Sequence, residues 1–432
     1  MEFTEMLKMN FPLMARIRQN FDTSTITDIS GEIRSQLSKL GLQGIVSPGQ
    51  SVAITAGSRG ISRLADILRA LVNELKGIQA KPFIVPAMGS HGGATAEGQE
   101  RLLAHYGVTE KGVGAPIKAS MEVTQIGETA GGLPVLIDKF ASQADHIVVV
   151  NRIKPHTDFE GIVESGLMKM LAIGLAKQKG ADLYHNEFMR LGHYHVITSV
   201  ARKIIEDCRI AFALAVVENQ RDEIEILRII PPKEIEETEK GLLLLAKELL
   251  PRIPFDPIDI LIVNQMGKNL SGTGMDQNVI ARSATPYHTV PSKPRIGRII
   301  VRDLTQDSDG NALGIGNADF VTKRLVDSID RGATYMNAMT SSCPELIRIP
   351  PHYDSDREVL EAAFRTLPES DPLGATIVHI ENTLRLEEMY ISEALIPEAK
   401  KIRNVSIVGT PEPMKFDPEG NLAVTIQCPA KH

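Results

Sequence analysis

The sequence predicts an α/β protein with two domains, each built on a mostly parallel, Rossmann-like sheet. Three observations support this prediction. The length of 432 residues suits two domains of ordinary size. Short apolar, β-rich runs alternate with amphipathic stretches, the pattern of a parallel sheet with crossover helices. The proline-rich segment PRIPFDP, at 251–257, separates two such series of elements.

Residues 1–252 are expected to form the N-terminal domain, because α/β patterns follow each other through this part of the chain. An antiparallel hairpin is expected within it at 121–137, turning near 128–132. The other predicted elements are strands at 51–55, 82–86 and 146–150, and helices at 61–75, through 102–103, at 165–177 and at 190–207.

Residues 256–410 are expected to form the C-terminal α/β domain, which opens with the strand IDILIV at 258–263. Residues 411–432 end in the run LAVTIQ, which predicts a closing strand. That strand could pair with the sheet of either domain, so the sequence does not assign it to one of them.

Composition excludes several classes of partner and site. The charge is 47 − 54 = −7 and no long basic block occurs, so neither nucleic acid nor an anionic membrane is an expected partner. Cys208, Cys343 and Cys428 lie far apart, which excludes a disulfide framework and indicates a reducing compartment. No run approaches the roughly 18 apolar residues of a membrane span. A cytoplasmic protein is expected.

Common nucleotide and hydrolase motifs are incomplete. The glycine pairs at 272/274 and 314/316 do not extend to GxGxxG between a strand and a helix, and Asn269 stands where a P-loop needs Ser or Thr. HExxH, GxSxG and EF-hand patterns are missing as well.

Polar, glycine-containing loops follow the predicted strands. Three N-terminal strands run into AGSRG, MGSHGGAT and NRIKPHTDFEG, and the strand IDILIV runs into NQMGKNLSGTG. Open α/β sheets bind ligands beyond the carboxyl ends of their strands, so the three N-terminal loops are expected to converge on one site. An active-site cleft between the two domains is the corresponding expectation.

Three residues of this region have unusual surroundings. His91 lies between glycines, where the backbone is free to approach a ligand. His156 lies in a turn-like segment just past a strand. Lys169 lies in the apolar run GLMKMLAIGLA. Two interpretations of this lysine stay open: its stem covers apolar surface and its amine reaches water, or the amine faces a site where desolvation makes it a nucleophile.

The segments NRIKPHTDFEG, ESGLMKM and GADLYH resemble, in this order, the core of the nickel-dependent lactate racemases. These enzymes use a nickel pincer nucleotide, pyridinium-3-thioamide-5-thiocarboxylic acid mononucleotide. The resemblance implies that Lys169, in a segment with Ser165 and Gly166, binds this cofactor covalently. It also implies that His185, sixteen residues after Lys169, ligates nickel.

The resemblance implies further roles in catalysis. His91 and His156 correspond to the paired acid/base histidines, and Arg59 to the arginine that binds the substrate carboxylate. Lys268 corresponds by position to a substrate-binding lysine. Near His91, Gly92 and Gly93 have backbone N–H groups suited to an anion such as the nucleotide phosphate, although a helix cap would explain the same residues.

The activity implied is that of a racemase or epimerase, an isomerase that inverts C2 of a 2-hydroxy acid by reversible hydride transfer to the cofactor. Cofactor-biosynthesis enzymes are the implied loading partners. Two departures concern the substrate: Ala56 replaces an acidic residue of the family, and the spacing from His156 to Lys169 is three residues longer. The substrate is therefore expected to be lactate-like or larger, including a sugar acid such as an aldonate.

Two other functions stay open from the residues alone. A metal-dependent hydrolase or lyase would use the same histidines with Lys169 as a structural residue. A non-catalytic protein would bind the cofactor only. His193 and His195 have a metal-ligand spacing, but they fall in a predicted helix, where residues two apart point in different directions. They are expected to be structural.

Overall fold

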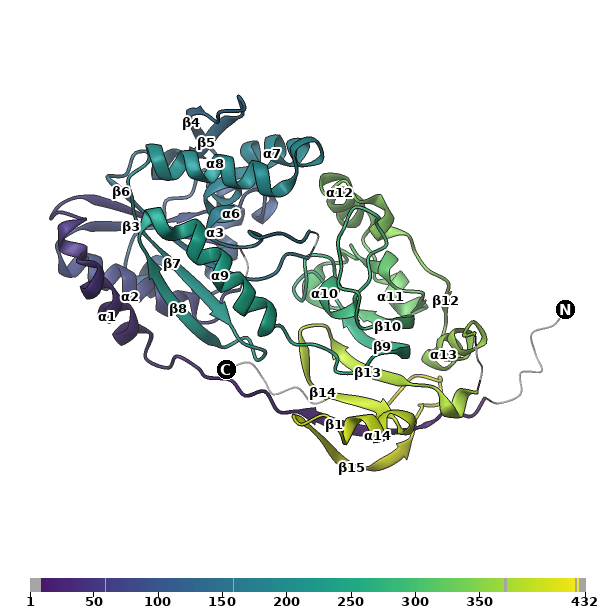
Figure 1. Ribbon diagram of the computed structural model, residues 1–432. Helices are drawn as coiled ribbons and strands as arrows, with labels where there is room; N and C mark the ends of the chain where they lie inside the picture. Colours follow the sequence, from purple (N-terminus) through teal and green to yellow (C-terminus); the bar gives the residue numbers. More distant parts are fainter. Residues whose placement is uncertain (1–8, 59, 158, 369–370, 424–425, 427–432) are drawn as a thin grey trace. The chain divides into compact units, whose positions relative to one another are not determined.

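The computed structural model describes residues 9–58, 60–157, 159–368, 371–423 and 426. These residues pack into two compact units (Figure 1). The N-terminal unit consists of Thr23–His156 and Gly161–Leu250, and the C-terminal unit of Met1–Asp22, Thr157–Glu160 and Pro251–His432. Within the described residues, no helix has both the length and the hydropathy that a membrane span requires.

The N-terminal unit is built on a five-stranded sheet of order β3-β2-β6-β7-β8. Its first four strands are parallel, and β8 closes one edge antiparallel to β7. A separate hairpin joins β4 and β5. The strands are β2 (Ser51–Ala56), β3 (Lys81–Pro86), β4 (Val123–Glu128), β5 (Pro134–Asp138), β6 (His146–Arg152), β7 (Ile210–Glu218) and β8 (Ile224–Ile230).

Helices connect these strands, and α9 packs beside β7 (Figure 1). The principal helices of the unit are α1 (Ile29–Leu40), α2 (Leu64–Gly77), α3 (Ala96–His105), α6 (Leu167–Lys169), the π-helical turn η3 (Met170–Gly174), α7 (Lys177–Leu191), α8 (His193–Asp207) and α9 (Ile235–Glu248). Short helices α4 (Glu110–Val113) and α5 (Lys139–Ser142) lie between them.

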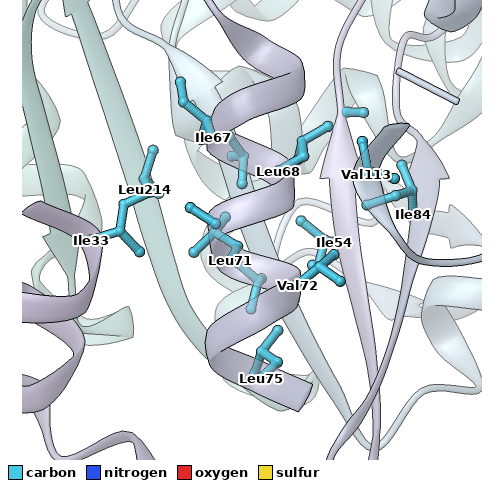
Figure 2. Packing of buried hydrophobic residues seen from close by; sticks show 14 of the residues in the cluster. Ile33, Ile54, Ile67, Leu68, Leu71, Val72, Leu75, Ile84, Val113 and Leu214 are labelled. Carbon is cyan, nitrogen blue, oxygen red and sulfur yellow. The ribbon is translucent and has the colours of Figure 1, made fainter. Parts of the chain in front are cut away.

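The core of this unit follows the apolar periodicity of α2. Apolar residues recur every three or four positions along this helix, so one face is buried. Figure 2 shows α2 side chains such as Leu71 between Ile33 of α1, Ile54 of β2 and Leu214 of β7, all of which are buried. Burying one such side chain contributes about 1.5–3 kcal/mol. This packing holds the parallel strands in place, and with them the loops at their carboxyl ends.

The C-terminal unit contains an eight-stranded mixed sheet of order β12-β11-β10-β9-β13-β14-β1-β15. The strands β12 to β13 of this order are parallel, and β14, β1 and β15 are antiparallel. The strands are β1 (Leu13–Gln19), β9 (Ile258–Met266), β10 (Ile296–Leu304), β11 (Phe320–Thr322), β12 (His352–Tyr353), β13 (Ile377–Asn382), β14 (Arg385–Ser392) and β15 (Val405–Pro413). The helices are α10 (Gln277–Ile280), α11 (Lys323–Asp327), α12 (Arg331–Thr340), α13 (Asp356–Arg365) and α14 (Ile396–Ala399).

The predicted fold class, an α/β protein with two mostly parallel sheets, is confirmed. The placement of the first residues differs from the predicted division at residue 252. Strand β1 belongs to the C-terminal unit, where it pairs with both β14 and β15. The cause is burial: Ala15 and Ile17 are fully buried in the core of the C-terminal sheet, and their partners lie more than 370 residues away in the sequence.

One local prediction also differs, and another falls largely outside the described residues. The helix expected at 190–207 is two helices, because Gly192 has φ +81° and ends α7 before α8 begins. For the closing strand LAVTIQ, residues 424, 425 and 427 lie outside the described residues. Leu422 forms a single antiparallel bridge with Phe416, and the terminal strand of the sheet is β15.

Candidate active site

The three polar loops of the N-terminal unit follow β2, β3 and β6, which are parallel neighbours, so they emerge at one edge of the sheet. The short helix α6 and the turn η3 contact two of these loops. The Gly89 N–H donates to the Gly174 carbonyl at 3.2 Å. A Cβ atom on Gly57 would lie 3.2 Å from Met170 Cε. The lysine-bearing segment therefore lies against the loops after β2 and β3.

Lys169 and His156 meet at this edge. The Lys169 Nζ and His156 Nε2 atoms lie 2.5 Å apart, and both side chains are half-buried. The Lys169 amine thus faces a polar side chain of a strand-end loop, which favours the second interpretation of this residue, that it faces a site. Ser165 pairs with Lys154 in an isolated bridge, which connects the start of the lysine segment to the loop that carries His156.

The backbone at His156 is held by a buried carboxylate, Glu164. Its Oε2 accepts the His156 N–H at 2.6 Å, its Oε1 accepts the Gly161 N–H at 3.0 Å, and Lys247 Nζ lies 2.7 Å from Oε1. Charge-assisted hydrogen bonds of this kind are stronger than neutral ones. Glu164 therefore fixes both ends of the loop that presents the imidazole.

A second buried carboxyl, Glu239 of α9, holds the first turn of α6. Its Oε2 accepts the Met168 N–H at 2.8 Å, and Glu239 is 0% exposed. Gly166 precedes this turn, and a Cβ atom there would overlap with the Glu239 carboxyl. On the other side, Asn151 Nδ2 donates to the Gly166 carbonyl at 2.7 Å. The glycine of the SGxxK segment is therefore required by packing.

The loop of His91 is compact. The His91 N–H donates to the Met88 carbonyl at 3.1 Å, and the side chain is exposed. Gly92 and Gly93 have φ +66° and +64°, values that glycine adopts readily. Thr95 caps α3 by accepting the Gly98 N–H at 3.0 Å, so capping accounts for this threonine.

The remaining predicted residues lie in different surroundings. His185 is half-buried on α7, with its ring 5.2 Å from that of Phe188. The Phe188 ring also contacts His193 at 4.5 Å, which agrees with a structural role for His193, and His195 is exposed on α8. Arg59 lies outside the described residues.

Lys268 belongs to the C-terminal unit, at the carboxyl end of β9. Its Nζ donates to the Gly272 carbonyl at 2.5 Å, and its N–H donates to Ser308 Oγ at 2.9 Å. Among the described residues of either unit, no three His, Cys, Asp or Glu side chains are grouped so that they would hold a metal ion by themselves.

Residues 14–194 match the protein family described as "Lactate racemase N-terminal domain". This part of the chain is similar to that family. The matched range includes Lys169, His185 and both strand-end histidines of the candidate site. No curated protein matches the chain.

Two solved structures are similar to the chain. One is the lactate racemase apoprotein from Thermoanaerobacterium thermosaccharolyticum, with 17% identity and a TM-score of 0.51; the match covers 86% of this chain and 99% of that one. The other is a protein from Thermotoga maritima, with 15% identity, a TM-score of 0.46, and coverage of 66% and 71%. The match to the apoprotein shows that the two chains share a fold.

Sequence analysis missed Glu239 and Lys177. Glu239 lies in the acidic stretch EIEETEKG, which is typical of a solvated helix face, and Lys177 lies in AKQKG, which has the composition of a surface turn. Both are 0% exposed. Their roles depend on contacts with residues distant in the sequence, and no local pattern indicates them.

The first prediction concerns Gly166. Gly166→Ala is expected to lower the free energy of unfolding by about 1–3 kcal/mol, because the added methyl group meets the Glu239 carboxyl in a packed core. Gly241→Ala is the matched control: this glycine lies in α9 with open space around it, so alanine is expected to be neutral or stabilising. Urea unfolding followed by circular dichroism measures both. Equal effects of the two substitutions would contradict the packing argument.

The second prediction concerns Glu239. Complete burial raises the pKa of its carboxyl from 4.5 to about 8. Above pH 4.5 the unfolded chain loses this proton while the folded protein keeps it, so stability is present at low pH and is lost as the pH rises to about 8. The wild type should lose up to about 1.4 kcal/mol per pH unit relative to Glu239→Gln across this window.

Unfolding by urea at pH 5, 6, 7 and 8 tests this dependence. The Gln variant corrects for every other titrating group, since it differs only at this carboxyl. Parallel stability curves for the two proteins would show that Glu239 ionises normally.

Proposed function

We propose that the protein is a racemase or epimerase that inverts C2 of a 2-hydroxy acid, with a nickel pincer nucleotide bound covalently to Lys169. The observation that carries the proposal is the meeting of Lys169 Nζ and His156 Nε2 at 2.5 Å, at the sheet edge of the part that is similar to the lactate racemase N-terminal domain. An amine for covalent attachment and an imidazole for proton transfer are thus adjacent.

The donor set of the site fits this cofactor. A primary amine is the group that forms a thioamide, and Lys169 offers one half-buried at the edge where the loops emerge. A neutral imidazole such as that of His185 is a good nickel ligand. Because the described side chains provide no group of three metal donors, a metal that receives its other donors from the cofactor suits them. When bound, the cofactor supplies an acceptor that takes and returns a hydride at C2.

The protein supplies proton transfer and orientation. His156, and His91 from the loop after β3, would each take the hydroxyl proton of one enantiomer and return a proton to the other, because imidazole is both acid and base near neutral pH. Arg59 would hold the substrate carboxylate through a bidentate pair. Lys268 would add a second cation at the substrate. Gly92 and Gly93 would offer backbone N–H groups to the nucleotide phosphate.

The substrate we propose is lactate-like or larger, with a sugar acid such as an aldonate included. Ala56 ends β2, three residues before Arg59, and replaces a charged side chain with a methyl group. A substrate with further hydroxyl groups would fill the space and supply the polarity that the missing carboxylate leaves. We propose that the protein acts in the cytoplasm, after loading by cofactor-biosynthesis enzymes.

The third prediction concerns covalent loading. Wild-type protein produced together with the cofactor-synthesis enzymes should carry an adduct on Lys169 and about one nickel per chain. Lys169→Ala should abolish the adduct and the turnover of 2-hydroxy acids, whereas Lys179→Ala, on the exposed side of α7, should retain both. Intact mass, peptide mapping and metal analysis measure loading. Unmodified wild type, alongside successful loading of a known lactate racemase, would refute the proposal.

The fourth prediction separates catalysis from binding. His91→Asn and His156→Asn should retain the Lys169 adduct but lower kcat by about 10²-fold or more, because proton transfer is lost. His195→Asn is the control, since this histidine is exposed on α8. Racemisation is followed by chiral chromatography over a panel of 2-hydroxy acids. Full activity in the His91 and His156 variants would show that these histidines are not the acid/base pair, and an adduct on wild-type Lys169 without turnover of any 2-hydroxy acid would indicate cofactor binding alone.

A further inference from the structure

Lys177 is fully buried at the start of α7, where an ammonium group is costly to place without partners. Its backbone has φ +56°, which non-glycine residues rarely adopt. A residue is kept in such a conformation only where its surroundings determine it. The side-chain contacts of Lys177 therefore need an explanation that ordinary core packing does not give.

Three oxygen atoms surround the ammonium group of Lys177. The Asp138 Oδ2 atom lies 3.1 Å away, the Gln99 Oε1 atom lies 3.3 Å away, and the Pro86 carbonyl also accepts a hydrogen bond. The Pro86 carbonyl and Gln99 Oε1 accept hydrogen bonds from the ammonium, and Asp138 Oδ2 forms an ion pair with it without a hydrogen bond. Burial lowers the pKa of Lys177 and raises that of Asp138, but the ion pair and the two hydrogen bonds of the ammonium support the charged pair.

Asp138 is oriented from its other side. It is 0% exposed, and its Oδ1 accepts the N–H groups of Phe140 and Ala141 at 2.8 and 2.9 Å. The carboxylate thus caps α5 with one oxygen and faces Lys177 with the other. The position of the ammonium is set by the hairpin strand β5, which ends at Asp138.

Gln99 connects the Lys177 ammonium with the loop after β3 through hydrogen bonds. Because its Oε1 faces the ammonium, its Nε2 points away and donates to the Gly89 carbonyl at 3.0 Å and the His91 carbonyl at 3.3 Å. The opposite amide orientation would direct N–H groups at the Lys177 ammonium, which is unfavourable. Gln99 is itself 0% exposed on α3. The ammonium of Lys177 therefore determines which carbonyl groups Gln99 holds.

We propose that Lys177 is a positioning residue for His91, acting through Gln99, with Asp138 as the counterion that keeps Lys177 charged. Proton transfer by His91 rests on the proposed function, whereas the ordering of its loop does not. Lys177 follows the short helix of Lys169 and the turn η3 in the sequence. It therefore connects the covalent site with the loop of His91. None of these three polar residues needs to touch the substrate.

Hydrogen exchange of the full chain without cofactor tests this inference. The amides of His91 and Ala94 donate within the loop, and their exchange reports its opening. The Asp138→Leu/Lys177→Met double variant removes the pair without leaving a buried charge, and Gln99→Met removes only the amide. Both should speed exchange in 89–95 by about tenfold, with exchange in α2 unchanged. Lys203→Met/Asp207→Leu, a half-exposed pair on α8, should leave the loop unchanged.

A readout specific to positioning is the titration of the His91 ring by NMR, with His91→Asn to assign its signal. In Gln99→Met the His91 midpoint should shift from its wild-type value, because the loop that carries the ring is no longer held in one conformation. Wild-type exchange in 89–95 and an unshifted His91 midpoint in folded Gln99→Met protein would overturn the inference. If the double variant does not fold, the exchange and titration of the Gln99→Met variant alone test the inference. Both readouts need no cofactor, so they fail or succeed independently of loading at Lys169.

Discussion

The short helix that carries Lys169 begins where a buried carboxyl meets a glycine, and the candidate site depends on this contact. Glu239 accepts a backbone N–H of the first turn, and Gly166 leaves the space that its carboxyl occupies. Asn151, at the end of β6, holds the same turn from the sheet. The helix is therefore fixed between α9 and the central strands before any of its own side chains is considered. A helix of three residues has little stability of its own, so its position comes from these contacts.

The N-terminal unit uses buried acidic groups in a consistent way around this site. Glu164 holds the loop of His156, Glu239 holds the helix of Lys169, and Asp138 holds Lys177 behind the loop of His91. Each of the three is at most 1% exposed. An unpaired buried charge reduces stability; Glu164 and Asp138 each have a lysine partner, and burial raises the pKa of Glu239 so that it keeps its proton at neutral pH. These buried carboxyl groups order the backbone, because each one holds a loop or helix start at one edge of the sheet.

The sequence predicted the architecture where local patterns are strong. The strands at β2, β3, β6 and β9 and the periodic helix α2 follow from apolar runs, and the parallel order of the strands placed their loops together. Local patterns failed where distant residues decide. In the sequence, no strand partner lies near β1, because its partners β14 and β15 are the last described strands of the chain. Within the site, the motif residues could be identified from their resemblance to a family, but Glu239 and Lys177 resemble surface charges until the chain is folded.

The position of β1 has a consequence for biosynthesis. This strand is synthesised before the other described strands, yet it lies between β14 and β15, which are made almost 400 residues later. The C-terminal sheet is thus completed only when its first strand pairs with strands that follow the N-terminal unit in the sequence. The entropy lost in closing a chain segment rises with its flexible length, and prior folding of residues 23–250 shortens that length greatly. During synthesis, the N-terminal unit can become compact before the last strands emerge. Strand β1 then pairs with β14 and β15 over a short flexible length of chain, at a smaller loss of entropy.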